Sequence, residues 1–185
     1  MAEQGLYSDG EKGVRRLTIP ELRVKDQDID GVKAEVLYGV LGASGRLDDH
    51  EASTEMLRIY NEWLADFCEG YEDRFAGLAS IPSHSVDDAV REIERVAKRG
   101  KLKGIEVANS HEMAPLFDPS WEPLWALAEE SRLPVHYHTI GPRIDYDFEA
   151  LAPLQRRQAF AVHITGFQLA MSKILMELLY GGVLE

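Results

Sequence analysis

Short apolar segments alternate with amphipathic helical patterns along this chain, and this alternation restricts the fold more than any other feature. Each apolar segment has the length of a strand, and each is followed by apolar residues at helical spacing. Strands spaced by helices form right-handed βαβ units, so the sequence predicts an α/β protein with a parallel sheet. The predicted strands are 34–39, 75–81, 103–108 and 135–139; helices are predicted from about 51 to 71, from Ser85 to Gly100, from Asp118 through Leu127, and over most of 150–180, with an interruption near Thr165 and Gly166.

The predicted sheet has too few strands to close on itself. Its strands are short and apolar, as expected for burial on both faces, and no antiparallel strand or charged edge covers either side. The chain ends at Gly182-Val-Leu-Glu185, where a helix would lead into a fifth strand. We therefore expect a polar lead-in at 1–20 and, at 21–185, about half of an eight-stranded TIM-type barrel. A small open α/β sheet, complete in itself, is the alternative.

Composition excludes several classes of protein. The 185 residues carry a net charge of -12, which repels phosphate backbones and anionic lipid, so neither nucleic acid nor a membrane is an expected partner. Residues 1–16 lack the apolar run of a secretory signal, and the apolar stretch 169–179 is too short to span a membrane. The single cysteine, Cys68, excludes an internal disulfide and a cysteine-rich zinc site, and we expect a buried thiol. A cytoplasmic location is expected.

His138 closes the fourth predicted strand, and the C-terminal ends of parallel strands form the working face of such proteins. Neutral imidazole is a preferred zinc ligand, and a strand end holds a ligand rigidly. One histidine does not hold a metal alone, so the residues by themselves favour a hydrogen-bonded histidine. His136 shares a face with His138 and could chelate the same metal. We expect His136 to lie one layer deeper in the barrel and to pack or form hydrogen bonds there.

Other polar residues give weaker signals. His163 lies near the predicted helix interruption, where a loop could bring it to a substrate; a surface or packing histidine is the alternative. Glu106 is a carboxylate in the middle of the third predicted strand, and it is either a buried acid or a residue that faces a loop or pairs with a lysine. No chemistry is assigned to the remaining histidines, which are His50, His84 and His111.

Residues 26–31 reproduce the opening of a calcium-binding EF-hand loop, with three aspartates and a glycine at the expected spacing. The loop needs a glutamate at its twelfth position, where this chain has Leu37. A strand also follows instead of a helix. We therefore expect these residues to form a solvated turn.

Several stretches, taken in order, carry a family resemblance. They are Asp26–Gly31 with Ala34–Tyr38, Tyr60–Leu64, Asp73–Gly77 with Ile81-Pro82, Ala89–Gly104, Asp118-Pro with Trp125, and Leu133–His138. Together they resemble the amidohydrolase superfamily, in the branch related to aminocarboxymuconate-semialdehyde decarboxylase. The resemblance covers nearly the whole chain after residue 20.

The resemblance implies a (β/α)8 barrel with a divalent metal, usually zinc, at its C-terminal mouth. The family's ligands are a His-x-His or similar pair on the first strand, a histidine that ends the fifth strand and an aspartate on the eighth. His138, four residues after Pro134, corresponds to the fifth-strand ligand. By this comparison the chain is a partial barrel that lacks the first strand and the last three.

The function implied by the resemblance is that of a metal-dependent hydrolase or nonoxidative decarboxylase, acting on a small carboxylate or amide. Its acid and base residues would lie outside this chain, so no catalytic residue is named and we expect the fragment to be inactive. The alternative is a noncatalytic half-barrel that associates through its open sheet edges, as a homo-oligomer or with another subunit.

Overall fold

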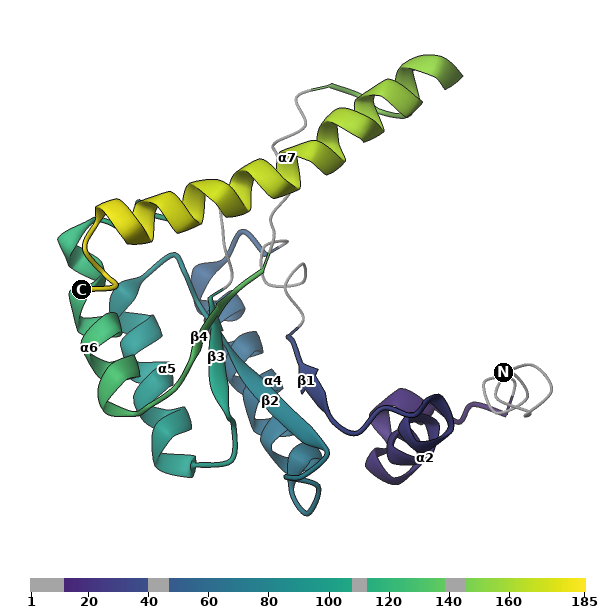
Figure 1. Ribbon diagram of the computed structural model, residues 1–185, viewed down its shortest axis with the longest axis vertical. Coiled ribbons are helices and arrows are strands. Elements are labelled where there is room, and N and C mark those ends of the chain that lie inside the picture. The colour runs from purple at the N-terminus through teal and green to yellow at the C-terminus, as the bar shows by residue number, and fades with distance from the viewer. Residues whose placement is uncertain (1–11, 40–46, 108–112, 139–145) are drawn as a thin grey trace.

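The computed structural model describes residues 12–39, 47–107, 113–138 and 146–185, and within them the chain forms a four-stranded parallel sheet (Figure 1). The strands lie side by side in chain order: β1 (Glu35–Leu37), β2 (Phe75–Ile81), β3 (Gly104–Val107) and β4 (Val135–Tyr137). Every neighbouring pair is parallel. Consecutive parallel strands joined by helices are the repeating unit of a (β/α)8 barrel, so the predicted partial barrel is confirmed.

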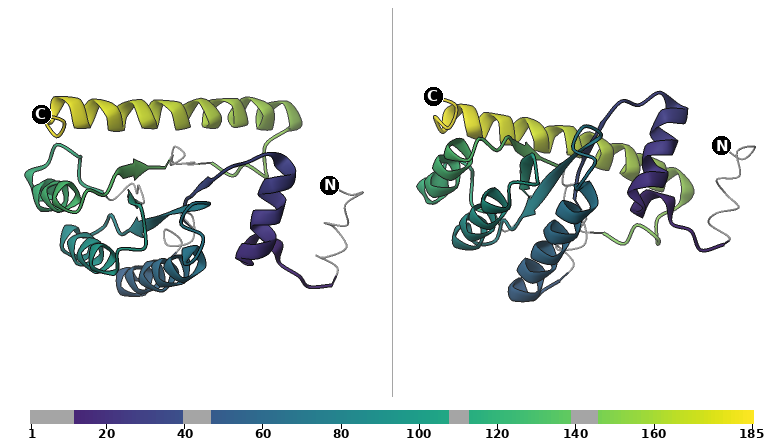
Figure 2. Two further views of the ribbon diagram at one scale, coloured as in Figure 1. Left: turned by 60° about the horizontal axis from the view of Figure 1, so that its bottom comes forward. Right: turned by 90° about the horizontal axis from the view of Figure 1, so that it is seen from below.

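Three helices connect the strands and pack against one side of the sheet, namely α4 (His50–Cys68), α5 (Val86–Arg99) and α6 (Glu122–Glu130). A 3₁₀ turn, η3 (Pro119–Trp121), leads into α6. Figure 2 shows α4 and α5 side by side along the strands. This arrangement leaves the other face of the sheet, which would be the inside of a closed barrel, uncovered by these three helices.

The helix boundaries follow from local capping. Asp49 accepts a hydrogen bond from the N–H of Ala52 at 3.1 Å, and Ser85 accepts one from Asp88 at 3.2 Å, so both helices begin with a satisfied donor. Gly100 ends α5 with a φ of 67°, a left-handed conformation that glycine adopts without a steric penalty. The predicted helix start at Ser85 and its end at Gly100 are therefore confirmed.

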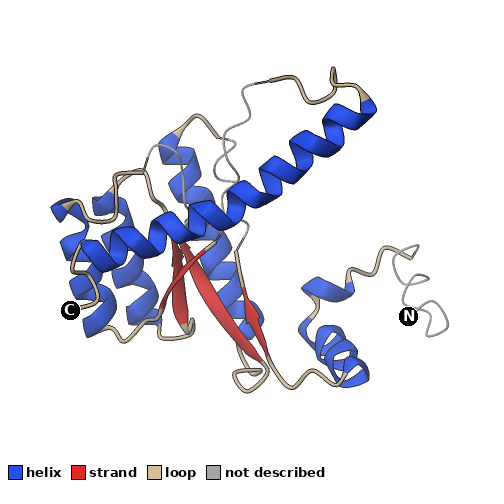
Figure 3. Ribbon diagram, turned by 45° about the horizontal axis from the view of Figure 1, so that its top comes forward, coloured by secondary structure: helices blue, strands red, loops and turns tan. Residues whose placement is uncertain are grey.

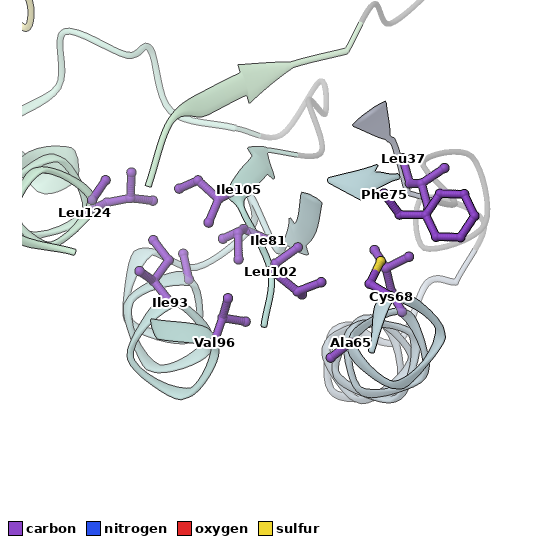
Figure 4. Packing of buried hydrophobic residues seen from close by; sticks show 14 of the residues in the cluster. Leu37, Ala65, Cys68, Phe75, Ile81, Ile93, Val96, Leu102, Ile105 and Leu124 are labelled. Carbon is purple, nitrogen blue, oxygen red and sulfur yellow. The ribbon is translucent and has the colours of Figure 1, made fainter. Parts of the chain in front are cut away.

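The core lies between the sheet and these helices (Figure 4). Residues at alternate positions of the strands point outward to it, and Ile81 and Ile105 are both 0% exposed. A methyl group on Gly77 would press against Leu64 and Cys68 of α4, which shows how closely that helix approaches β2. Burial raises the pKa of the Cys68 thiol, consistent with the predicted buried cysteine.

The predicted solvated turn at residues 26–31 is wrong, because most of this segment is helical. Residues 20–30 form α2 (Pro20–Asp30), which follows the short η2 (Arg16–Thr18). Proline at the first helical position favours a helix start, and Gly31 ends the helix with a φ of 72°. Arg16 binds Asp26, and Arg74 binds Asp28 at 2.8 Å, so arginines neutralise two of the three aspartates that resembled a calcium loop.

The last helix, α7 (Pro153–Tyr180), is continuous through Thr165 and Gly166, so the predicted interruption is absent. Figure 3 shows that its first half extends beyond the sheet, while its second half lies beside it. By length and composition alone α7 is apolar enough to cross a membrane, and 6% of its most apolar window is buried. Long core helices of soluble proteins share this length and composition, and the expected absence of a membrane partner stays a prediction.

A buried amide takes the place of a strand at one point of β2. The pairing of β1 with β2 ends at Leu37 and Gly77. Three residues further on, Asn61 of α4 donates to the carbonyl of Ser80 at 2.9 Å and accepts from its N–H at 2.8 Å. The same amide donates to Glu92 at 2.6 Å, and Arg95 binds that carboxylate in turn. Asn61 therefore takes the place of β1 beside Ser80, whose other neighbour is Glu106 of β3.

Replacing Asn61 with alanine should destabilise the protein by ~2–4 kcal/mol, because two main-chain groups and a carboxylate lose a buried partner. Urea unfolding measures this loss. Glu55→Ala is the matched control on the same helix, since its partly exposed ion pair with Arg58 should contribute little to stability. Equal effects of the two substitutions would contradict the role given to Asn61.

Candidate functional site

Polar side chains gather on the inner face of the sheet, which α4, α5 and α6 do not cover. Because side chains alternate along a strand, the residues that follow the outward Ala79, Ile105 and Val135 point to this inner face. The pairing register places Ser80 beside Glu106 and Glu106 beside His136 on three successive strands. His138 comes two residues after His136 and one residue after β4 ends. We call Tyr38, Ser80, Glu106, His136 and His138 the polar cluster.

Glu106 lies at the centre of the polar cluster and is 0% exposed. Its Oε2 accepts a hydrogen bond from the N–H of Gly39 at 2.7 Å, whereas its Oε1 has no partner among the described residues. Burial raises the pKa of Glu106, and the Gly39 N–H, His138 and His136 each oppose this rise. Of the two alternatives left open by the sequence, the structure shows a buried acid.

Gly39 passes directly over β2 to reach Glu106 on β3. A Cβ atom at Gly39 would overlap the Ser80 hydroxyl and would lie 3.2 Å from the Cβ of Ser80. The hydroxyl itself is buried and has no hydrogen-bond partner among the described residues. The close approach of the backbone to Ser80 therefore requires a glycine at position 39.

Tyr38 reaches across the sheet to β4. Its hydroxyl lies 3.0 Å from Nδ1 of His136, and its ring meets the rings of His136 and His138 edge-on, with centroids 5.6 and 6.2 Å apart. The predicted hydrogen-bonding role of His136 is confirmed. Together with the Gly39–Glu106 bond, this contact ties the end of β1 to both β3 and β4.

The structure brings His138 to the polar cluster but does not bring His163 there. His138 is exposed at the C-terminal end of β4, as expected for a residue at a barrel mouth. His163 lies in the middle of α7 with its ring edge-on to Phe167, at a centroid distance of 4.9 Å. His50 and His84 stack on each other at 4.3 Å, and His111 lies outside the described residues.

The described residues do not complete a metal site. Within the ranges given above, no three histidine, cysteine, aspartate or glutamate side chains lie close enough together to hold a metal ion. A divalent metal in proteins of this kind needs three or four such ligands. His138 could supply one ligand, but the others do not come from the part of the chain that the structure describes.

A pocket of about 240 Å³ lies beside the polar cluster, at the edge of β1. Its walls are mainly apolar and aromatic, and Arg23 is the one charged side chain among the described residues that line it. The others are Val36, Leu37, Tyr38, Tyr60, Trp63, Leu64 and Phe67. The hydroxyl of Tyr60 donates to the carbonyl of Tyr38 at 3.2 Å, and burial raises the pKa of Tyr60 to about 12. Tyr60, in the wall of the pocket, thus holds the backbone from which Tyr38 reaches the histidines.

Three members of this arrangement were not found from the sequence, namely Tyr38, Gly39 and Ser80. The sequence places Tyr38 and Gly39 at the end of the first predicted strand and Ser80 within the second, and gives none of them a further role. The alternation within 75–81 could have shown that Ser80 shares a face with Leu78. Only the pairing register shows that Ser80 lies beside Glu106.

Gly39→Ala should lower the free energy of unfolding by ~1–3 kcal/mol, because the added methyl overlaps Ser80. Adding Ser80→Ala removes the overlapping hydroxyl and should recover part of this loss, giving a coupling energy above ~0.5 kcal/mol. Chemical denaturation of the two single variants and the double variant measures the cycle. Additive effects would mean that the two residues do not meet.

Comparison with known proteins agrees with the partial-barrel fold described above. A family model described as amidohydrolase matches residues 14–166, most of the sequence. Gamma-resorcylate decarboxylase of Rhizobium radiobacter is 28% identical over 134 residues, which is 69% of this chain and 41% of that protein. The 2-amino-3-carboxymuconate-6-semialdehyde decarboxylase of Dictyostelium discoideum is 21% identical over 166 residues, or 90% of this chain and 44% of that protein.

A solved structure shows the same fold. The dihydroxybenzoic acid decarboxylase of Polaromonas sp. JS666, crystallised with manganese and the inhibitor 2-nitroresorcinol, matches with a TM-score of 0.67 and 20% identity. The match covers 95% of this chain and 54% of that one. The chain belongs to the amidohydrolase family, as the sequence resemblance predicted. It spans less than half the length of the curated relatives that it matches.

Proposed function

We propose that this chain is the part of an amidohydrolase-type decarboxylase barrel that carries the fifth-strand metal ligand, His138. The observation that carries the proposal is the position of His138 at the C-terminal end of a parallel strand, beside a buried carboxyl group on the inner face. Both curated relatives described above are decarboxylases, which favours decarboxylation of a small carboxylic acid over hydrolysis.

A divalent metal is part of this proposal for the whole barrel. The Polaromonas structure holds manganese, so we propose manganese or zinc, with zinc resting on the sequence resemblance alone. The described residues supply one candidate ligand, and the family resemblance places the acid, the base and the remaining ligands on other strands of the barrel. Within this chain, the inner-face residues provide a rigid polar wall: Glu106 fixes the backbone at Gly39, and Tyr38 contacts the histidines. His163 as a substrate contact stays a prediction without support from its position.

The DNA that flanks the reading frame tests the proposal directly. Translation upstream should give a His-x-His or similar pair at the end of a first strand. Translation downstream should give a histidine and an aspartate at later strand ends. Stop codons on both sides, with no such motifs beyond them, would overturn the proposal and leave a half-barrel.

The 185-residue chain should retain far less than one equivalent of manganese or zinc after dialysis, because its described residues offer no complete ligand set. Metal analysis of the dialysed protein measures this. His138→Ala, the matched variant, should retain no less metal than the parent chain. Stoichiometric, tightly held metal that is lost in His138→Ala would contradict the view that the site is incomplete.

A second candidate function is a noncatalytic half-barrel that associates through its sheet edges, and the exposed edge at β1 favours it. Val36 is 51% exposed on this edge strand, and Trp63 beside it is 43% exposed. An uncovered strand with apolar side chains is a template for pairing with another chain. A homo-oligomer would bury this edge.

Val36→Lys should lower the molar mass measured by light scattering during size-exclusion chromatography, because a charge on an edge strand opposes strand pairing. Ile59→Lys is the matched control, since Ile59 is 55% exposed on α4, away from the sheet edge. A monomeric parent chain, or the same loss of association in both variants, would count against pairing through β1.

A further inference from the structure

The two residues after β1 form a bridge over the inner face of the sheet. Gly39 donates its N–H to Glu106 on β3 at 2.7 Å, and it crosses Ser80 of β2 too closely for any side chain. One residue earlier, Tyr38 reaches past β3 and places its hydroxyl 3.0 Å from Nδ1 of His136 on β4. The backbone is held from the other side by Tyr60, whose hydroxyl donates to the carbonyl of Tyr38 at 3.2 Å.

These contacts leave Tyr38 with little freedom to move. Its backbone is fixed at its own carbonyl and at the N–H of the next residue, and its ring is fixed by the hydroxyl contact at its far end. Because the backbone and the hydroxyl of Tyr38 are already restrained, its side chain loses little further conformational entropy when it orients a neighbouring side chain. Tyr38 is 46% exposed, so its position is not a consequence of burial in the core.

The imidazole of His136 is restrained in the same way. Tyr38 lies at Nδ1 on one side, and on the other side the ring carbon Cδ2 lies over Gly104, 3.6 Å from where a Cβ atom would be. A neutral imidazole has one N–H and one acceptor nitrogen, and the partner of one nitrogen decides the tautomer. A phenol hydroxyl is a good donor and an imidazole nitrogen a good acceptor. A Tyr38 hydroxyl that donates to Nδ1 would leave the single proton of a neutral His136 ring at Nε2.

We propose that Tyr38 is a positioning residue for the two histidines of β4: its hydroxyl fixes the ring and tautomer of His136, and its ring edge limits the rotation of His138. The inference deepens the proposed function, and it rests on that function only for the role of His138 as a ligand. Ligand orientation by a neighbouring group strongly affects metal affinity in such sites. The contact from β1 would thus prepare a ligand on a strand three positions away in the sheet.

Tyr38→Phe tests this, because it removes the hydroxyl and keeps the ring. Long-range proton–nitrogen NMR spectra of the histidine side chains should be recorded above pH 8, where unperturbed imidazoles are neutral. The Nδ1 resonance of His136 should move from a hydrogen-bonded to a free acceptor position in Tyr38→Phe, and the side-chain signals of His136 and His138 should indicate greater mobility. The signals of His163 in α7 should stay in place.

Tyr146→Phe is the matched control, because Tyr146 is 47% exposed and is not part of the polar cluster. It should leave the signals of His136 and His138 unchanged. Unchanged His136 and His138 signals in Tyr38→Phe, in a variant whose backbone spectrum remains that of the folded protein, would overturn the inference. So would an Nδ1 signal of a protonated nitrogen in the parent chain. Neither result depends on bound metal or on turnover, so failure here is distinct from failure of the proposed decarboxylase function.

Discussion

The hydrogen bond from Gly39 to Glu106 is the constraint on which the inner face of this protein depends. It joins β1 to β3 across an intervening strand, which ordinary sheet pairing does not do. A carboxylate with one oxygen satisfied and the other buried is unfavourable unless its protonation or its surroundings compensate. The raised pKa of Glu106 is the expected response to that burial. The close approach of Gly39 to Ser80 and the contact of Tyr38 with His136 both accompany this bond.

Asn61 makes this arrangement possible from the opposite face of the sheet. If β1 continued beside β2 beyond Gly77, its backbone would satisfy Ser80, and it could not turn inward towards Glu106. The amide of Asn61 supplies the donor and the acceptor that a strand would have supplied. A residue in the helix layer therefore allows β1 to end early, and the inner-face contacts exist because it does.

The sequence predicted the regular part of the fold well, and the reasons are physical. The strand Phe75–Ile81 was predicted with its observed bounds, because an apolar run of strand length followed by proline has few other structures. The end of α7 was also predicted, but its continuity was not: Gly166 lowers helix propensity, yet a helix of 28 residues tolerates one glycine. The helix at 20–30 was missed because its charge pattern resembled a loop and its ion pairs reach residues far along the chain.

The polar cluster was predicted in part. His136, His138 and Glu106 were singled out because they lie within or at the end of predicted strands, and the role of His138 as a metal ligand stays a prediction. Tyr38, Gly39 and Ser80 were not singled out, because their importance arises from the register between strands and from one close approach, neither of which is encoded by local spacing. A single sequence can indicate which face a residue occupies, but not which residue lies across from it.

The two halves of α7 have different sources of stability. Its buried residues, Ile174 and Glu177, lie in the second half, where Glu177 also accepts from the N–H of Leu116 at 3.0 Å. The first half has Phe160 and Val162 exposed at 58% and 70%, and it depends on intrinsic helix propensity, which β-branched residues lower. Opening of α7 should therefore begin at Pro153 and stop near the middle, so that the helix unravels as a gradient rather than as one cooperative unit.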